Sequence, residues 1–162
     1  MKIEKLKLKN FRNYDDLEIV FNDKLNIIIG NNAQGKTNIL EAIYFLSITK
    51  SNFPINDKTC IKKDMLFSKI EGLINNNESN KKISILMNAN GKKLEVNGEE
   101  IKKHSQYLGN LRVILFNPDD VRLIKESPNN RRRFLNIEIS QLYSRMWSNI
   151  RRRASVQVPL FQ

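Results

Sequence analysis

Apolar and polar residues alternate over the first part of the chain. Leu6, Leu8 and Phe11 are spaced for one strand, and alternation over residues 17–21 predicts a second, because successive side chains of a strand point to opposite faces. Residues 25–29 instead form a short apolar run, which predicts a third strand buried on both faces. Strands of that kind belong to sheets covered by helices, so the start of the chain favours an α/β fold.

The spacing of the apolar residues changes after residue 36. They then fall on one face of a helix, formed by Ile39, Leu40, Ile43, Phe45 and Leu46. A strand, a loop with two glycines and a helix therefore follow one another directly. Polar residues and Pro54 within residues 47–60 end the periodicity and predict a loop.

Residues 68–101 predict an antiparallel β meander. Short apolar runs in this stretch are separated by polar turns, and Asn90-Gly91 and Asn97-Gly98 suit tight hairpins because these residue types tolerate a positive φ. Residues 75–82 are polar and predict an exposed connection between two of the strands.

The last part of the chain predicts one more strand and one long helix. Residues 112–116 again have the pattern of a buried strand, and Ser127-Pro128 is typical of a helix start. The helix carries one apolar stripe, formed by Leu135, Ile139, Leu142, Met146 and Ile150. Residues 151–162 lose this spacing, so we expect one unit over residues 1–150 and an appended or frayed tail over residues 151–162.

Length and composition are those of a folded protein with one core, either a whole domain or a piece of a larger one. The first residues alternate charge with apolar side chains and do not resemble a secretory signal, and no apolar run is long enough to span a bilayer. The single cysteine, Cys60, has no partner for an internal disulfide and is expected to be a buried or half-buried thiol. We therefore expect a cytoplasmic protein without a membrane partner.

The chain is strongly basic, with 28 Lys and Arg against 17 Asp and Glu and a net charge of +11. This balance favours an anionic partner such as nucleic acid or a polyphosphate, although a solvated lysine-rich surface would give the same composition. Arg131, Arg132 and Arg133 stand in the first turns of the predicted helix, where positive charge opposes the helix dipole. They are candidates for binding DNA phosphates, a nucleotide or a neighbouring carboxylate, with a merely solvated cluster as the alternative.

The loop between the third predicted strand and the first helix carries the most specific chemistry. Its residues match G-x-x-x-x-G-K-[ST], and they are Gly30, Asn31, Asn32, Ala33, Gln34, Gly35, Lys36 and Thr37. The two glycines let successive amide groups converge on phosphate oxygens, Lys36 supplies positive charge to the β and γ phosphates, and Thr37 offers a hydroxyl to magnesium. We predict that this loop binds ATP together with Mg2+.

Hydrolysis would also require an acidic residue at the end of a buried strand, to organise the magnesium ion. The only acidic pair after a later apolar strand is Asp119-Asp120, which lies beyond the strand end with Pro118 between. A turn and helix-capping role suits this pair better than that of a Walker B acid. We therefore expect the chain to bind ATP and to lack catalytic acids.

Three segments together resemble the RecF family, which comprises bacterial recombination mediators related to SMC-type ABC ATPase heads. The run Leu-Lys-Asn-Phe-Arg-Asn-Tyr over residues 8–14 is similar to the turn after the family's first strand, and residues 25–44 are similar to its P-loop and first helix. Residues 118–136 are similar to a stretch that separates RecF from other ABC-type heads, apart from Glu126, where the family usually has a small residue. The resemblance extends to about residue 145.

This resemblance implies a P-loop NTPase of ABC or SMC-head type. The chain would be its N-terminal ATP-binding lobe, an incomplete domain with a mixed sheet and an antiparallel β meander. In the family, two heads close on two ATP sites, and the signature and Walker B motifs lie in the second half of the chain. ATPase activity is therefore expected only of the full-length homodimer.

The resemblance also implies a role and partners. Members of the family bind DNA at single-strand gaps and, with RecR and RecO, support RecA loading, replication, repair and the SOS response. Arg12 is implied as a second contact near the nucleotide, whereas the resemblance assigns no role to Arg131–Arg133. The alternatives are a basic interaction module for nucleic acid or protein with a vestigial P-loop, another SMC-type repair ATPase, or a small P-loop kinase, although the sequence lacks the lid residues of a kinase.

Overall fold

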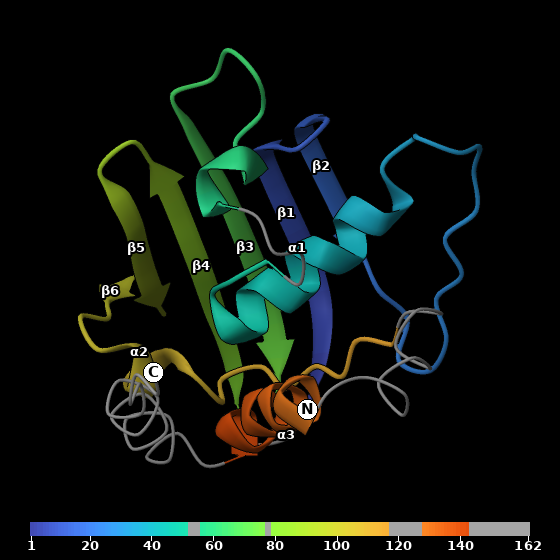
Figure 1. Ribbon diagram of the computed structural model, residues 1–162. Helices are drawn as coiled ribbons and strands as arrows, with labels where there is room; N and C mark the ends of the chain where they lie inside the picture. Colours follow the sequence, from blue (N-terminus) through green and yellow to red (C-terminus); the bar gives the residue numbers. More distant parts are fainter. Residues whose placement is uncertain (52–55, 77–78, 117–127, 143–162) are drawn as a thin grey trace, which may run out of the picture.

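A computed structural model describes residues 1–51, 56–76, 79–116 and 128–142. Six strands form one sheet in the order β2-β1-β3-β4-β5-β6, and α1 lies across one face of it (Figure 1). The strands are β1 (Lys2–Phe11), β2 (Tyr14–Val20), β3 (Phe67–Asn75), β4 (Asn80–Asn88), β5 (Gly91–Val96) and β6 (Glu99–Glu100). The helices are α1 (Lys36–Ile48), α2 (His104–Tyr107) and α3 (Pro128–Leu142), with a short 3-10 helix, η1 (Asp57–Cys60).

The core lies between the sheet and α1. Alternate residues of β1, β3 and β4 point toward the helix, which buries Ala42, Phe45 and Leu46 against them. The fully buried apolar residues on the strands include Leu6, Leu8, Phe11, Ile70, Ile74, Ile83 and Ile85. Burial of each such side chain stabilises the fold by about 1.5–3 kcal/mol. This burial fixes the register of the strands and the position of α1 on the sheet.

The first two predicted strands, the helix from Lys36 and the β meander are confirmed. The meander follows the two predicted turns, with Asn97 at φ 53° and Gly98 at φ 85° between β5 and β6. Two successive residues with positive φ match the right-handed twist of the flanking strands, which is the physical reason that Asn-Gly marks a hairpin.

The outer face of the sheet carries a charge-balanced lattice of side chains. Lys7 pairs with Glu18 across β1 and β2, and Lys9 pairs with Asp16 on the same two strands. Glu71 of β3 accepts contacts from Lys82 Nζ at 2.7 Å and from Lys69 Nζ at 3.3 Å. The lysines of this face are therefore largely neutralised by neighbouring carboxylates.

The stability that Glu71 contributes to this lattice depends on pH. Partial burial acts to raise its pKa, but the hydrogen bonds from Lys82 and Lys69 hold the pKa below its usual value. A lowered pKa in the folded state adds stability above the unfolded-state pKa, and this stability is lost as the pH falls through the folded-state pKa. We expect Glu71→Gln to lower the free energy of unfolding by about 0.5–1 kcal/mol at pH 7 and by clearly less at pH 3. Chemical denaturation at the two pH values measures the difference, and an equal cost at both would contradict it.

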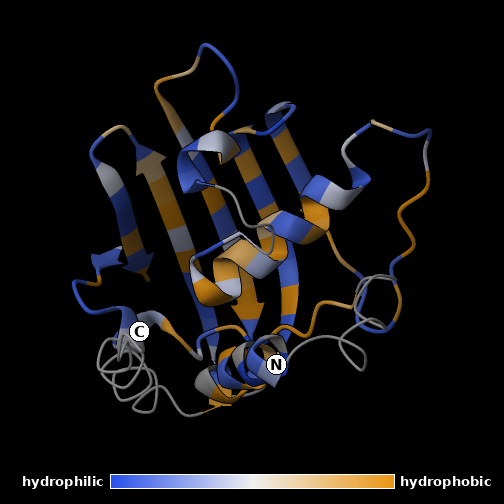
Figure 2. Ribbon diagram, viewed as in Figure 1, coloured by the Kyte–Doolittle hydropathy of each residue, from blue (hydrophilic) through white to orange (hydrophobic). Residues whose placement is uncertain are grey.

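Two predicted strands are wrong. Residues 25–29 and 112–116 form no strand. Ile29 is 88% and Ile114 81% exposed, whereas Ile28 and Val113 are only partly buried against the core, so neither segment is buried on both faces. Both appear as apolar segments outside the sheet (Figure 2). A strand exists only through its ladder of backbone hydrogen bonds, and no strand among the described residues pairs with either segment. Every described pairing is antiparallel, so the parallel part of the predicted mixed sheet is not formed within the described residues.

Helix α3 begins at the predicted Pro128 but packs differently from its apolar stripe. Gln141 is buried and Ile137 packs against Tyr44 and Ile48 of α1, together with Leu108, whereas Leu135 and Leu142 are each 55% exposed. Two polar contacts explain this orientation, because the Gln141 amide bonds both the N–H and the C=O of Val113. None of the described helices has the length and apolar character needed to cross a membrane.

Several sequence-based predictions concern residues outside the described ranges. They are Asp119-Asp120, the N-cap role of Ser127, the stripe residues Met146 and Ile150, and the tail over residues 151–162.

Candidate nucleotide-binding site

The predicted phosphate loop, residues 30–37, connects the exposed segment 25–29 to the first turn of α1. Gly35 is the N-cap of α1 with φ 96°, no side chain caps this helix end, and its first turn contains no acidic residue. The first N–H groups of a helix have no partner within the helix. The positive end of α1 is therefore open to an anion.

The loop is closed by its own side chains. Lys36 Nζ donates to the carbonyl oxygens of Gly30 at 2.7 Å and Asn31 at 2.6 Å, and Asn31 N donates to the Gln34 side-chain oxygen at 3.0 Å. A Cβ atom on Gly30 would come within 2.7 Å of that same Gln34 oxygen. The fold thus holds the lysine ammonium over the loop, where a phosphate would meet it.

The turn between β1 and β2 supports the loop from the side. Asn13 Nδ2 and the Tyr14 hydroxyl both donate to the carbonyl oxygen of Gln34, at 3.2 and 3.3 Å. Asn38 of α1 donates to Asn13 Oδ1 at 2.8 Å, which orients the Asn13 amide. Burial raises the pKa of Tyr14 above its usual value, so the phenol keeps the proton that it donates.

A buried ion pair lies behind this turn. Arg12 donates from Nε and Nη2 to the two carboxylate oxygens of Glu41, at 2.9 and 2.6 Å, and from Nη1 to the carbonyl of Thr59 at 3.1 Å. Glu41 is 1% exposed and also accepts from the Ser51 hydroxyl. These contacts join the end of β1, helix α1 and η1.

Cys60 lies beside the ion pair and is fully buried, which confirms the prediction of a buried or half-buried thiol. Burial is the main cause that raises the pKa of its thiol to about 12. A thiol with such a pKa stays protonated at neutral pH and is a packing group rather than a nucleophile.

The donor set fits a nucleoside triphosphate. The loop supplies an ammonium, an uncapped helix end and two glycines whose added Cβ atoms would clash with neighbouring atoms. Thr37 is exposed in the first turn of α1, where a hydroxyl could reach a magnesium ion. No cluster of His, Cys, Asp or Glu suited to a metal occurs among the described residues.

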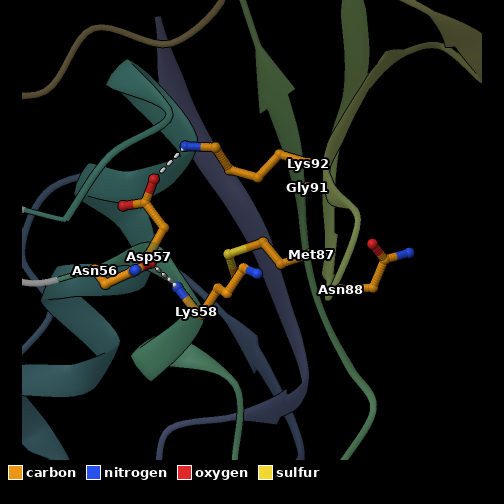
Figure 3. Close-up of a pocket in the computed structure, with 7 residues that line it drawn as sticks. All are labelled: Asn56, Asp57, Lys58, Met87, Asn88, Gly91 and Lys92. Carbon is orange, nitrogen blue, oxygen red and sulfur yellow. Dashed lines mark hydrogen bonds and ion pairs between the residues drawn. The ribbon is translucent and has the colours of Figure 1, made fainter.

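A second hollow lies at the other end of α1, between η1 and the β4–β5 hairpin (Figure 3). Its volume of about 160 Å³ is too small for a nucleotide. Its lysine, Lys92, is already engaged, because Nζ contacts Asp57 Oδ2 at 2.5 Å and the Thr49 carbonyl at 2.6 Å. Lys92 therefore lies at the carboxyl end of α1, where its positive charge complements the helix dipole.

The structure separates the predicted arginine cluster from the loop. Arg131 and Arg132 are exposed near the start of α3. This helix packs on the C-terminal half of α1, whereas the loop lies at the N-terminal end of that helix. The predicted contact of Arg12 with the nucleotide stays a prediction, since its guanidinium is bound by Glu41 and Thr59.

Sequence reasoning missed Asn13, Asn38, Tyr14 and Glu41 as residues of the site. A signal for Glu41 was present, because a carboxylate four residues before Phe45 lies on the apolar face of α1 and must find a buried partner. Nothing in the spacing of Asn13 and Tyr14 indicated that they contact Gln34, since they are separated from it by about twenty residues and by the exposed segment 25–29.

An antiparallel sheet covered by a helix that follows a phosphate loop is the arrangement of one class of ATPase. A model of the AAA ATPase domain matches residues 1–154, and the chain belongs to this family. Within it, the chain is similar to the DNA replication and repair protein RecF of Halalkalibacterium halodurans and of Bacillus cytotoxicus. Each is 45% identical over 142 residues, which are 88% of this chain and 38% of the relative. The predicted RecF resemblance is thereby confirmed.

Solved structures agree with this assignment. The recombination mediator protein RecF of the RecFOR pathway, with ATPrS, superposes with a TM-score of 0.87 at 32% identity, covering 92% of this chain and 41% of that one. The same protein with ATP gives 0.86 at 31% identity, covering 95% and 43%. The SMC head domain from Thermotoga maritima shares the fold, with a TM-score of 0.53 at 23% identity over 63% of this chain and 39% of the head. The fold class is confirmed, and the chain spans about 38% of the length of its curated relatives.

Proposed function

We propose that residues Gly30–Thr37 bind ATP with Mg2+, and that the chain is the ATP-binding lobe of a RecF-type protein of DNA replication and repair. The closed and uncapped loop at the start of α1 carries this proposal. The family match and the likeness to RecF structures with ATP support it.

The residues of the loop divide the work. Lys36 would exchange its two carbonyl contacts for phosphate oxygens, and the first amides of α1 would donate to the same anion. Thr37 would offer its hydroxyl to the metal ion. Bound ATP and Mg2+ supply the phosphoanhydride bond and the charge that shields it, whereas this chain contributes binding and orientation. Hydrolysis is proposed for the full-length homodimer, in which further residues complete the site.

The wider role follows the same relatives. The proposed activity is ATP-dependent binding to DNA at single-strand gaps, in the cytoplasm, with RecR and RecO as partners and with support of RecA loading, DNA replication, repair and SOS induction. The distribution of charge supports a nucleic-acid partner, because residues 101–162 contain 12 Lys and Arg against four Asp and Glu, whereas residues 1–100 contain 16 against 13. Arg131, Arg132 and Arg133 fall in the basic part and are the proposed phosphate contacts.

Lys36→Ala tests the nucleotide proposal. We expect ATP to bind about 10- to 100-fold more weakly in the full-length protein, because a charge-assisted hydrogen bond contributes about 1.5–3 kcal/mol. Titration with a fluorescent ATP analogue measures the change. Lys24→Ala removes the same charge from an exposed position outside the loop and should leave the affinity unchanged. Equal affinities of the Lys36 and Lys24 variants would contradict the proposal.

DNA binding by the same variants separates the alternative function. The interaction-module alternative predicts that nucleotide makes no difference to DNA affinity or its salt dependence. The proposal predicts that ATP strengthens DNA binding in the wild-type protein and in Lys24→Ala but not in Lys36→Ala. Measurement at several salt concentrations gives the number of phosphate contacts from the slope.

A further inference from the structure

The carbonyl group of Gln34 is the only point at which the β1–β2 turn holds the phosphate loop, as far as the described residues show. It accepts two hydrogen bonds from outside the loop, from Asn13 Nδ2 and from the Tyr14 hydroxyl. A carbonyl held by two donors cannot turn without losing both. The two side chains therefore fix the peptide unit that joins Gln34 to Gly35.

The direction of that peptide unit decides where one amide of the loop points. In a trans peptide the C=O and N–H groups are coplanar and point in opposite directions. Because the carbonyl of Gln34 points to Asn13 and Tyr14, the N–H of Gly35 points away from the β1–β2 turn. An anion that meets the Gly35 N–H must therefore approach from the side that faces away from the turn. Lys36 Nζ contacts the Gly30 and Asn31 carbonyls of the same loop and would meet such an anion as well.

We propose that the β1–β2 turn is a brace that presents the Gly35 amide to the phosphates, and that Arg12 acts through this brace as a positioning residue. This inference rests on the proposed ATP binding. It gives Arg12 a role different from the direct nucleotide contact implied by the family resemblance. Asn13 and Tyr14 hold the peptide, and the Arg12–Glu41 pair holds the turn.

The backbone of the turn explains why a buried ion pair is needed there. Arg12 has φ 54°, a left-handed conformation that is unfavourable for a side chain of this size. Its N–H donates to the Cys60 carbonyl at 2.8 Å, and its guanidinium is bound by Glu41 and Thr59. These contacts hold Arg12 in its strained conformation. The left-handed turn then directs the side chains of Asn13 and Tyr14 onto the loop.

Tyr14→Phe and Asn13→Ala test the brace directly in the full-length protein. Each removes one hydrogen bond to the Gln34 carbonyl. Asn13 is exposed, and Tyr14→Phe keeps the ring that packs against the core, so the fold should persist. We expect ATP to bind about fivefold more weakly in each single variant and about 20-fold more weakly in the double variant. Melting temperatures should stay close to that of the wild-type protein, and amide hydrogen exchange at residues 34–36 should accelerate.

Glu41→Gln distinguishes positioning from direct contact. If Arg12 touches the nucleotide, Glu41→Gln should strengthen ATP binding. The variant removes the negative charge that competes with the phosphates for the Arg12 guanidinium. The brace predicts the reverse, a loss of about fivefold, because a neutral amide cannot accept both guanidinium bonds and the turn loosens. Arg12→Lys should show a similar loss, since an ammonium cannot form the fork that Arg12 makes with Glu41.

The outcomes separate this inference from the proposed function. Wild-type protein that binds ATP, Lys36→Ala that does not, and unchanged affinity in the Asn13/Tyr14 double variant would overturn the brace alone. Tighter binding in Glu41→Gln would also overturn it. Wild-type protein that binds no ATP would overturn both proposals. Weaker binding in the turn variants with unchanged melting temperature and faster exchange at Gly35 would establish the brace.

Discussion

Gly35→Val is expected to reduce ATP affinity by about 1000-fold or more, the largest binding effect of any single change in the loop. Gly35 has φ 96°, where a β-branched residue is strongly disfavoured. Its added Cβ would also lie 2.6 Å from both polar atoms of the Asn13 amide and 2.8 Å from the Tyr14 hydroxyl. The side chain therefore displaces the brace and distorts the helix N-terminus together, and the two costs sum to about 4 kcal/mol.

Gly98→Val is the matched control for this variant. Gly98 has a similar φ of 85°, but nothing lies within 4 Å of the position that its Cβ would take. The valine should therefore strain the β5–β6 turn, at about 1–2 kcal/mol, without touching the nucleotide site. Isothermal titration with ATP should show the large loss only for Gly35→Val. A comparable loss in both variants would attribute the effect to general instability rather than to the geometry of the loop.

The parts of the fold that could be predicted from sequence are those whose signal is local. Alternation over β1 and β2, the Asn-Gly turns of the meander and the change of period at Lys36 each depend on neighbouring residues. The phosphate loop is likewise a local motif, because its glycines, lysine and threonine stand within eight consecutive residues. Its relation to the following helix is confirmed by α1 beginning at Lys36.

Whether the apolar segments 25–29 and 112–116 form strands could not be predicted from local sequence. Their apolar runs show that they suit a buried position, but a strand also requires an edge to pair with. No described strand offers either segment that edge, and Leu25, Ile27 and Phe116 are more than 70% exposed. The composition of a segment sets what it can bury, whereas its pairing is set by residues distant in sequence.

The exposed stripe of α3 has a related cause. Spacing predicted that Leu135, Ile139 and Leu142 share a face, which does not say that this face packs against the body of the fold. The Gln141 amide and Ile137 decide the orientation, since Gln141 satisfies both backbone groups of the partly buried Val113. One specific polar contact therefore outweighs the apolar stripe among the described residues.

Glu41→Ala is expected to lower the free energy of unfolding by about 3–5 kcal/mol, the largest stability effect of a polar substitution in this lobe. Glu41 is 1% exposed and receives two bonds from Arg12, whose side chain is 20% exposed. Removing the carboxylate leaves the Arg12 guanidinium in a largely dry site without its charged partner, and it removes the hydrogen bond that Ser51 donates to Glu41. Denaturation followed by circular dichroism, with the full-length protein, measures the loss.

An exposed pair that joins β1 and β2 provides the control. Lys9 and Asp16 lie 3.1 Å apart, with side chains 51% and 70% exposed, so Asp16→Ala should cost less than about 0.5 kcal/mol.

The double variant Arg12→Ala/Glu41→Ala should cost less than the two single changes together, because it leaves no unpaired charge in the interior. Additive losses, or a Glu41→Ala cost as small as that of Asp16→Ala, would show that the pair is not the buried anchor of the turn. In the proposed brace, the size of this coupling also limits how firmly the β1–β2 turn can hold the phosphate loop, because Asn13 and Tyr14 contact Gln34 from the turn that Arg12 begins.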